Sequence, residues 1–189
     1  MNYVCSFFGH RNFEENKEII DNLEKLIESL IVNYNVNSFL FGSRSKFDDL
    51  CHNIVYNLKQ KYPHIKTVIY ICPSEGYVLT EKKDEYEKLY NSYFKRDIKI
   101  IPYDEVYKHK NWLISGRASY IERNYAMIDN SDYCVFYYNK NYLPKMKKLN
   151  KRHLTTIQPN SGTKLAFNYA KQKKKIVINV LKNINIIYN

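Results

Sequence analysis

The amino-acid sequence predicts a three-layer α/β fold, in which helices cover both faces of a mostly parallel sheet. Short apolar runs alternate with longer amphipathic stretches along all 189 residues. This alternation is typical of repeated β-α-β units, whose crossovers are right-handed. The runs are continuously apolar, as at residues 67–72, which is typical of strands buried on both faces. The length is that of one domain, so we expect residues 1–189 to form a single domain.

Six apolar runs are predicted to be the strands of this sheet. They lie at residues 2–8, 38–41, 67–72, 98–101, 133–138 and 176–180. The first helix is predicted to begin at Asn12, because Glu15 three positions later completes the pattern of a capping box. Apolar residues at helical spacing then continue as far as Ile31.

Four further helices are predicted between the later strands. The second ends before Pro63, because the residue preceding a proline avoids the helical conformation. The third is a charged stretch at about residues 80–93. The apolar positions of the second, fourth and last helices are Phe47, Leu50, Ile54 and Leu58; Ala118, Ile121, Tyr125 and Ile128; and Leu165, Phe167, Tyr169 and Ala170.

Membrane and metal-binding classes are not supported by the sequence. No apolar run approaches the roughly 18 residues of a membrane span, and the amino terminus lacks the charged head of a signal peptide. We therefore expect a cytoplasmic protein that does not contact a membrane. The 4 cysteines and 5 histidines show no spacing typical of metal ligands. We expect no metal site, and we expect the cysteines to be reduced thiols in the core.

Positive charge is concentrated in the last third of the chain. The net charge is +11, and the last acidic residue is Asp132, beyond which stand 12 Lys or Arg residues. This distribution favours an anionic partner for the last third of the chain. The alternative is that the lysines keep a Tyr- and Asn-rich chain soluble.

Glycine and polar residues follow the first predicted strand, at the end of the sheet where open α/β proteins bind their ligands. The triplet is Gly9, His10 and Arg11, directly before a helix. Glycine lets backbone amides approach a ligand, the helix amino terminus favours an anion, and arginine binds a phosphate through two N–H groups. The alternative is a turn glycine with two exposed polar neighbours.

A second glycine turn follows the second predicted strand. It contains Gly42, Ser43 and Arg44, and Asp48 stands a few residues further on. Asp48 is a candidate acceptor for ribose hydroxyls. The alternative is that it stabilises the start of the following helix electrostatically.

Two later segments complete the set of candidate ligand-binding residues. Ser161, Gly162 and Thr163 open the last helix and offer amides and hydroxyls to a phosphate, or alternatively only cap that helix. Arg123 lies opposite the apolar positions of its helix or at their border, which is typical of a solvated face. Neither a GxGxxG nor a P-loop motif is present, so we predict no cofactor.

Taken together, these segments resemble the SLOG superfamily, a Rossmann-like group that includes DprA and the LOG phosphoribohydrolases, and they are most similar to its YpsA-like branch. The matching pieces span nearly the whole chain. They are Phe8-Gly9-His10-Arg11, Phe41-Gly42-Ser43-Arg44 with Phe47-Asp48, Arg123-Asn124 with Met127-Ile128-Asp129 and Ser131-Asp132, and Ser161-Gly162-Thr163 with Ala170 and the strand after it.

The resemblance implies a Rossmann-like fold and a nucleotide-type ligand held by the strand-end loops, with Ser161, Gly162 and Thr163 against phosphate. Some members of the superfamily cleave the N-glycosidic bond of nucleoside monophosphates, and others are inferred sensors of nucleotide signals. DprA binds single-stranded DNA. Members often dimerise, so the resemblance also leaves a homo-oligomer open.

Two departures from the family pattern bear on the function. Ala166 stands where LOG enzymes carry a glutamate that works in catalysis, so hydrolysis here would need Asp48 or Glu122 as the carboxylate. The link at about residues 139–160 is long and basic, whereas close relatives make it short. It is interpreted as a lid over phosphates, as a nucleic-acid site that extends through residues 139–175, or as a solvated loop.

The sequence therefore predicts a nucleotide-binding protein of sensor or regulatory type. The predicted ligand-binding residues are Gly9, His10, Arg11, Gly42, Ser43, Arg44, Asp48, Arg123, Ser161, Gly162 and Thr163. The alternatives are a nucleotide N-glycosidase that uses Asp48 or Glu122, and a protein that binds single-stranded nucleic acid in the DprA manner.

Overall fold

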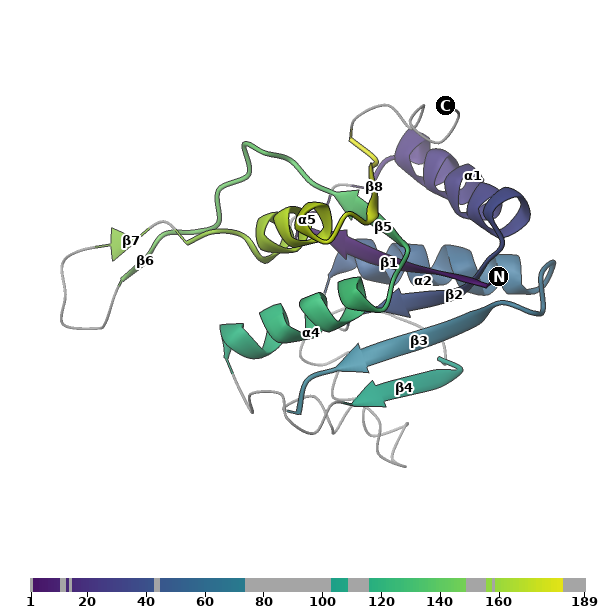
Figure 1. Cartoon of the computed structure of the whole chain (residues 1–189). Helices are drawn as coiled ribbons and strands as arrows, with labels where there is room; N and C mark the ends of the chain where they lie inside the picture. Colours follow the sequence, from purple (N-terminus) through teal and green to yellow (C-terminus); the bar gives the residue numbers. More distant parts are fainter. Residues whose placement is uncertain are drawn as a thin grey trace, which may run out of the picture.

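The central feature of the structure is a six-stranded parallel sheet. A computed structural model describes residues 2–10, 13, 15–42, 45–73, 103–108, 116–148, 156–157 and 159–181. The strand order is β4-β3-β2-β1-β5-β8, and every neighbouring pair is parallel. The strands are β1 (Tyr3–Gly9), β2 (Val36–Phe41), β3 (Lys66–Ile71), β4 (Glu105–Lys108), β5 (Tyr133–Tyr137) and β8 (Ile176–Asn179). The predicted α/β fold is confirmed (Figure 1).

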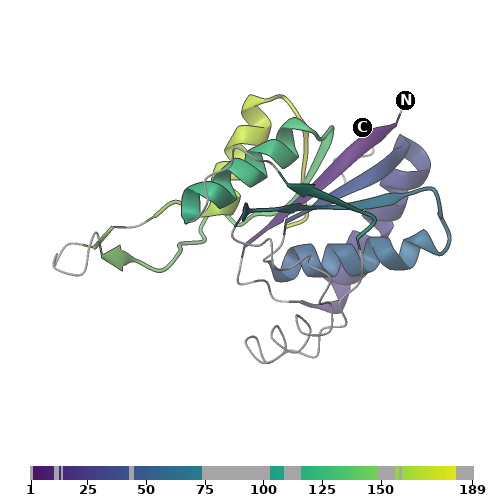
Figure 2. The ribbon, with the colours of Figure 1, turned by 90° about the horizontal axis from the view of Figure 1, so that it is seen from below.

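Helices cover both faces of this sheet. The described helices are α1 (Lys17–Tyr34), α2 (Lys46–Lys59), α4 (Arg117–Asp129) and α5 (Gly162–Gln172). The first two pack on one face and the last two on the other, as the two views in Figures 1 and 2 show. The three predicted layers are therefore present, and the arrangement is Rossmann-like.

The strand order reverses direction between β1 and β5. From β1 the chain builds outward through β2, β3 and β4, and it then returns to the other side of β1 to build β5 and β8. In doubly wound sheets, ligands bind beyond the carboxyl ends of the strands near such a reversal. The carboxyl ends of β1, β2 and β5 are therefore the part of this fold where a ligand is expected.

The first helix begins later than the sequence predicts. The predicted start at Asn12 is wrong, because α1 begins at Lys17 and Asn16 is its N-cap residue. The Asn16 side chain accepts a hydrogen bond of 2.8 Å from the Ile19 N–H, and so satisfies one amide of the first turn. Phe13 is instead buried against Phe47 and belongs to the core.

The strand that pairs with β3 is one that the apolar pattern does not indicate. The predicted strand at residues 98–101 and the predicted helix at 80–93 both lie outside the described residues. The observed partner of β3 is β4, and all four of its residues are exposed. An exposed edge strand needs no apolar run, which explains why the sequence pattern did not indicate it.

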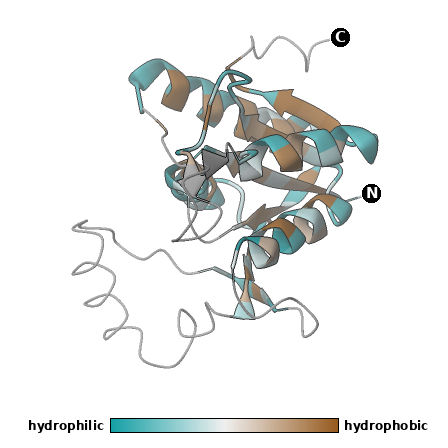
Figure 3. Cartoon of the chain, turned by 90° about the vertical axis from the view of Figure 1, so that its left-hand side faces the viewer, coloured by the Kyte–Doolittle hydropathy of each residue, from teal (hydrophilic) through white to brown (hydrophobic). Residues whose placement is uncertain are grey.

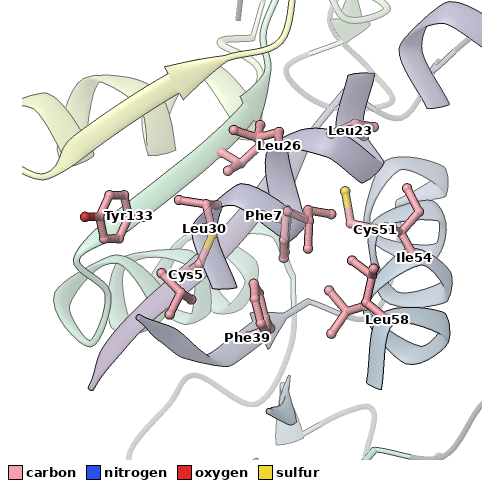
Figure 4. Close-up of a cluster of buried hydrophobic side chains, with 14 of the residues drawn as sticks. Cys5, Phe7, Leu23, Leu26, Leu30, Phe39, Cys51, Ile54, Leu58 and Tyr133 are labelled. Carbon is pink, nitrogen blue, oxygen red and sulfur yellow. The ribbon is translucent and has the colours of Figure 1, made fainter. Parts of the chain in front are cut away.

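The larger hydrophobic core lies between the sheet and the pair α1 and α2. Phe7 stacks on Phe39 and on Phe41 at ring-centroid distances of 6.1 and 5.2 Å. Leucines and isoleucines of both helices pack on these rings (Figure 4). Figure 3 shows the same division by hydropathy, with apolar strands in the middle and helices that are apolar on part of their surface. All four cysteines are buried free thiols, as predicted.

A narrow extension leaves the body of the molecule after β5. The basic link contains β6 (Lys147–Lys148) and β7 (Thr156–Ile157), which form an antiparallel pair. This pair reaches well away from the sheet, and we call residues 140–148 and 156–157 the arm (Figure 1). None of the helices in the described part of the chain has both the length and the apolar character that a membrane span requires.

Candidate functional site

The carboxyl end of β2 brings together an acid and a base from helices on opposite faces of the sheet. Asp48 comes from α2 and Arg123 from α4, and each is only 6% exposed. A Cβ atom placed on Gly42, just after β2, would lie 2.8 Å from an Arg123 Nη atom and 3.3 Å from Asp48 Oδ2. The two side chains therefore converge over the bare backbone of Gly42, where a larger residue would require the Arg123 guanidinium to shift. We call these three residues the β2-end cluster.

Burial dominates the electrostatics of Asp48. Loss of solvent raises the pKa of Asp48 to about 8, while the nearby positive charge of Arg123 acts in the opposite direction. The neighbouring Asp49 raises this pKa further, and a hydrogen bond from the Ser45 side chain lowers it. Within the described residues, Asp48 Oδ1 is buried and has no hydrogen-bond partner. Burying an acid in this state is costly to the fold, and such groups are typical of functional sites.

The position of Asp48 in its helix accounts for part of its chemistry. Ser45 is the N-cap residue of α2, and its hydroxyl accepts a 3.0 Å hydrogen bond from the Asp48 N–H. Asp48 is thus the third helical residue, where an acid favours the positive helix end. That role explains an acid at this position. It does not require the side chain to be buried beside Arg123.

The carboxyl ends of β1 and β5 are joined by a buried histidine. His10 follows β1 and is 2% exposed. Its Nε2 atom lies 3.0 Å from the Asn139 amide nitrogen and 3.2 Å from the Asn139 carbonyl oxygen, beyond the end of β5. The ring thus has a backbone partner whether Nε2 accepts or donates. Tyr142 stacks on it with ring centroids 4.1 Å apart. These contacts close the gap between the two strands at the reversal point.

Desolvation also shapes the chemistry of His10. Burial lowers the pKa of His10, and the hydrogen bond to the Asn139 backbone acts in the opposite direction. In the described part of the chain, its Nδ1 atom is buried without a hydrogen-bond partner. His10 is therefore held as a neutral ring near pH 7.

The start of α5 is fastened to the end of β1. The Thr163 hydroxyl donates a 2.9 Å hydrogen bond to the Gly9 carbonyl, and the Ser161 hydroxyl accepts one of 3.0 Å from the Lys164 N–H. The Ser161 carbonyl accepts from the Leu165 N–H. Both hydroxyls predicted to meet a phosphate therefore already serve the backbone. The first-turn amides of Gly162 and Thr163 are those that Ser161 does not bind.

The glycines of the site have different steric surroundings. A Cβ on Gly9 would lie 2.3 Å from Phe47 Cβ, so β1 and α2 are in contact there. A Cβ on Gly162 would meet nothing within 4 Å. Gly9 is therefore required by packing, whereas Gly162 borders open space at the start of α5.

Most of the predicted site residues that the structure describes lie at this edge of the sheet. They are Gly9, His10, Gly42, Asp48, Arg123, Ser161, Gly162 and Thr163. Arg11, Ser43 and Arg44 lie outside the described residues. Glu122 is partly buried on α4. Its side chain leaves that helix about 100° around the axis from Arg123, so the two do not share a face.

The prediction that Arg123 lies on a solvated face is wrong. The buried residues of α4 are Ser119, Arg123, Met127 and Ile128, whereas the predicted apolar residue Ala118 is exposed. The buried face of α4 thus carries a hydroxyl and a guanidinium along with its apolar residues. Ser119 was missed by the sequence analysis. The signal that could have found it is the four-residue spacing of Ser119, Arg123 and Met127, which places all three on one face.

Asn139 and Tyr142 were also missed as residues of this edge. Both lie in the basic link, for which the sequence leaves a lid, a nucleic-acid site and a solvated loop open. Their contacts with His10 join residues 129 positions apart in the sequence, counted from His10 to Asn139. A pairing at that separation leaves no local sequence pattern.

Comparisons with known proteins give no further identification. No family model matches the chain, and no curated protein matches it. The likeness to the SLOG superfamily stays a prediction that rests on the motif residues named above.

Proposed function

We propose that the carboxyl edge of the sheet binds a nucleotide or a nucleotide-derived ligand, and that the protein is a sensor or regulator. The observation that carries this proposal is the convergence of Asp48 and Arg123, both more than nine-tenths buried, over Gly42. Burying an acid and a base is unfavourable unless they pair well or serve a site. The β2-end cluster lies beside the reversal of strand order, where such ligands bind in this class of fold.

The chemistry of the edge fits a phosphate-bearing ligand. Arg123 supplies a fixed positive charge, and guanidinium groups bind phosphate through two parallel hydrogen bonds. The first amides of α5, which border open space at Gly162, add positive potential on the neighbouring strand end. The Asp48 carboxyl, next to Arg123 over Gly42, adds a hydrogen-bonding group for the same ligand. The predicted likeness to the SLOG superfamily favours the same ligand class.

An N-glycosidase is less favoured by the arrangement of carboxylates. Ala166, at the position where LOG enzymes carry their glutamate, is fully buried in the cluster of α5 with Phe8 and Phe136. A carboxylate at that position would be in the core. Glu122 leaves α4 on another side from Arg123, which leaves Asp48 as the acid that the β2-end cluster contains.

The test is thermal unfolding of the protein with a panel of nucleotides. The panel holds nucleoside monophosphates, NAD, ADP-ribose and cyclic nucleotides, and each mixture is analysed by chromatography afterwards. A ligand at about 100 times its dissociation constant stabilises the fold by about 2.7 kcal/mol. We expect a shift with the ligand recovered intact. Release of free base would instead indicate the glycosidase, and no shift with any member would contradict the proposal.

Two variants localise the binding. Arg123→Met keeps a long side chain but removes the charge, and we expect it to weaken binding at least tenfold. Lys66→Met is the matched control, because Lys66 is exposed at the opposite edge of the sheet, where it pairs with Glu105. Equal affinity in the two variants would remove Arg123 from the site.

A second candidate function is binding of single-stranded nucleic acid by the arm. The specific observation is that the arm leaves the body and exposes Lys140 and Lys145 beside Leu143 and Met146, which are 71% and 61% exposed. Cations beside apolar side chains suit a strand that offers both phosphates and bases. Fluorescence anisotropy with an oligothymidine at several salt concentrations tests it. We expect Lys140→Gln with Lys145→Gln to reduce the salt slope by about 1.4, and a binding signal without salt dependence would contradict it.

A further inference from the structure

The β2-end cluster holds an acid at a point where an anion would be bound, and this conflict has a chemical consequence. Asp48 Oδ2 and the Arg123 guanidinium border the same small space over Gly42. An anion drawn to Arg123 would stand within a few ångströms of the Asp48 carboxyl. Two negative charges that close repel strongly in a buried site. The pair can accept a phosphate only if the acid is neutral.

The groups around Asp48 leave it free to take a proton. Those that act on its carboxyl are Arg123 from α4, Asp49 of its own helix and the Ser45 hydroxyl, and Cys51 one turn later is buried beside it. Arg123 is the positive charge among them. Its field is the main electrostatic influence that favours the ionised acid, and a bound anion would neutralise that field. Binding of the anion therefore favours protonation of Asp48.

We propose that the site takes a phosphate-bearing ligand together with one proton, which Asp48 holds, and that Asp48 then donates its O–H to the phosphate. The proton comes from the solvent, the carboxylate becomes a carboxylic acid, and no other bond is made or broken. Because linkage is reciprocal, ligand affinity and proton affinity rise together. This inference rests on the proposed function, since it concerns the same site.

The protonation state of the free protein gives the expected pH range. Burial raises the pKa of Asp48 to about 8, so at pH 6.5 the acid already holds its proton. At pH 9 most of the free protein carries the carboxylate and must take up a proton when the ligand binds. A phosphate monoester has its second pKa near 6, so the ligand itself stays a dianion from pH 7.5 upward.

Isothermal titration calorimetry with AMP tests this proposal. Titrations at pH 6.5, 7.5 and 9, each in two buffers of different ionisation enthalpy, count the protons exchanged on binding. For the unaltered protein we expect close to one proton taken up at pH 9, and little uptake by Asp48 at pH 7.5 and below. Above pH 8 we expect the affinity to fall by up to tenfold per pH unit.

Asp48→Asn is the decisive variant, because asparagine keeps the shape and cannot take up the proton. We expect it to bind AMP with no proton uptake at pH 9 and with an affinity that is flat between pH 7.5 and 9. Asp21→Asn is the matched control, since Asp21 is exposed on α1, and it should behave like the unaltered protein.

The possible failures are distinguishable. Binding of AMP by the unaltered protein at pH 9 without proton uptake would overturn the proton-linked site and leave the proposed function standing. Proton uptake that persists in Asp48→Asn would assign the proton to another group and would also overturn the proton-linked site. No binding of AMP by any of the three proteins between pH 6.5 and 9 would instead contradict phosphate-ligand binding at this edge, and the linked site with it.

Discussion

The ends of β1 and β5 and the end of β2 are neighbours in the sheet, yet they are built in opposite ways. At β1 and β5, the His10 ring bonds to the Asn139 backbone, and the Thr163 hydroxyl donates to the Gly9 carbonyl. At β2, Asp48 and Arg123 are buried beside the place that a Cβ atom on Gly42 would take, and Asp48 Oδ1 finds no partner among the described residues. One region is closed by bonds to the backbone of the strand ends, and the other buries a carboxyl and a guanidinium group together over Gly42.

This difference bears on how the rule for doubly wound sheets applies here. The rule places ligands at the reversal of strand order, which in this sheet lies between β1 and β5. That gap is bridged by the His10 contacts, with Tyr142 stacked over the ring. We therefore expect ligand recognition to centre on the β2-end cluster one strand away. The β1 and β5 ends would then act mainly as its support.

The largest loss of stability is expected at Gly9, where the end of β1 packs directly on α2. Gly9→Ala places a Cβ 2.3 Å from Phe47 Cβ, and Phe47 is fully buried on α2, so the helix has to move. We expect a loss of about 3 kcal/mol in the free energy of unfolding, measured by urea titration.

Gly162→Ala is the control for this variant, because its Cβ would meet nothing within 4 Å. We expect its free energy of unfolding to stay within about 0.5 kcal/mol of that of the unaltered protein. Equal stabilities for the two alanine variants would show that the contact between β1 and α2 is not as close as described. Gly9 and Gly162 would then not differ in how closely their neighbours pack.

An intermediate change in the free energy of unfolding is expected from Asp48→Asn in the protein without ligand. The folded protein keeps the Asp48 proton up to about pH 8, whereas the unfolded chain releases it near the ordinary value of 3.8. The folded state therefore binds more protons between these values, and the contribution of Asp48 to stability falls as pH rises through that window. Asparagine has no such dependence.

Between pH 6 and pH 9, the stability of Asp48→Asn relative to the unaltered protein should improve by about 2.7 kcal/mol. Thermal unfolding at the two pH values measures this as a relative shift of several degrees. Asp21→Asn again provides the surface control. A pH-independent difference between Asp48→Asn and the unaltered protein would mean that the acid is already ionised at pH 6, so that burial would not set the β2 end apart from the β1 and β5 ends.

The sequence predicted the buried strands and the turns of this molecule better than its exposed edge strand. Five of the six apolar runs became strands of the sheet, because a strand buried on both faces has to be apolar. The sixth strand, β4, is exposed at every residue and has no such requirement. Gly9, Gly42 and the start of α5 at Gly162 were also found, since turns at strand ends and helix starts have local sequence signals.

What the sequence missed depends on contacts between distant segments. The burial of Arg123 follows from its meeting with Asp48, which lies on the opposite side of the sheet and 75 positions earlier in the chain. The contact of His10 with Asn139 has the same character. Helical periodicity placed Arg123 with the solvent because its face of α4 is only partly apolar. Side chains of this kind are recognised once the fold brings them together.

The smallest loss of stability is expected from removing the hydrogen bond that joins α5 to β1. Thr163→Val removes the 2.9 Å hydrogen bond to the Gly9 carbonyl, and a loss of about 1 kcal/mol in unfolding free energy is expected. Thr67→Val is the matched control, because the buried Thr67 hydroxyl bonds to Asp104 at the amino end of β3, at the other edge of the sheet. If the β1 end only supports the site, Thr163→Val should weaken AMP binding less than threefold, and Thr67→Val should leave it unchanged. A loss in Thr163→Val as large as that in Arg123→Met would instead place the phosphate at the start of α5, and ligand recognition would then extend across both strand ends.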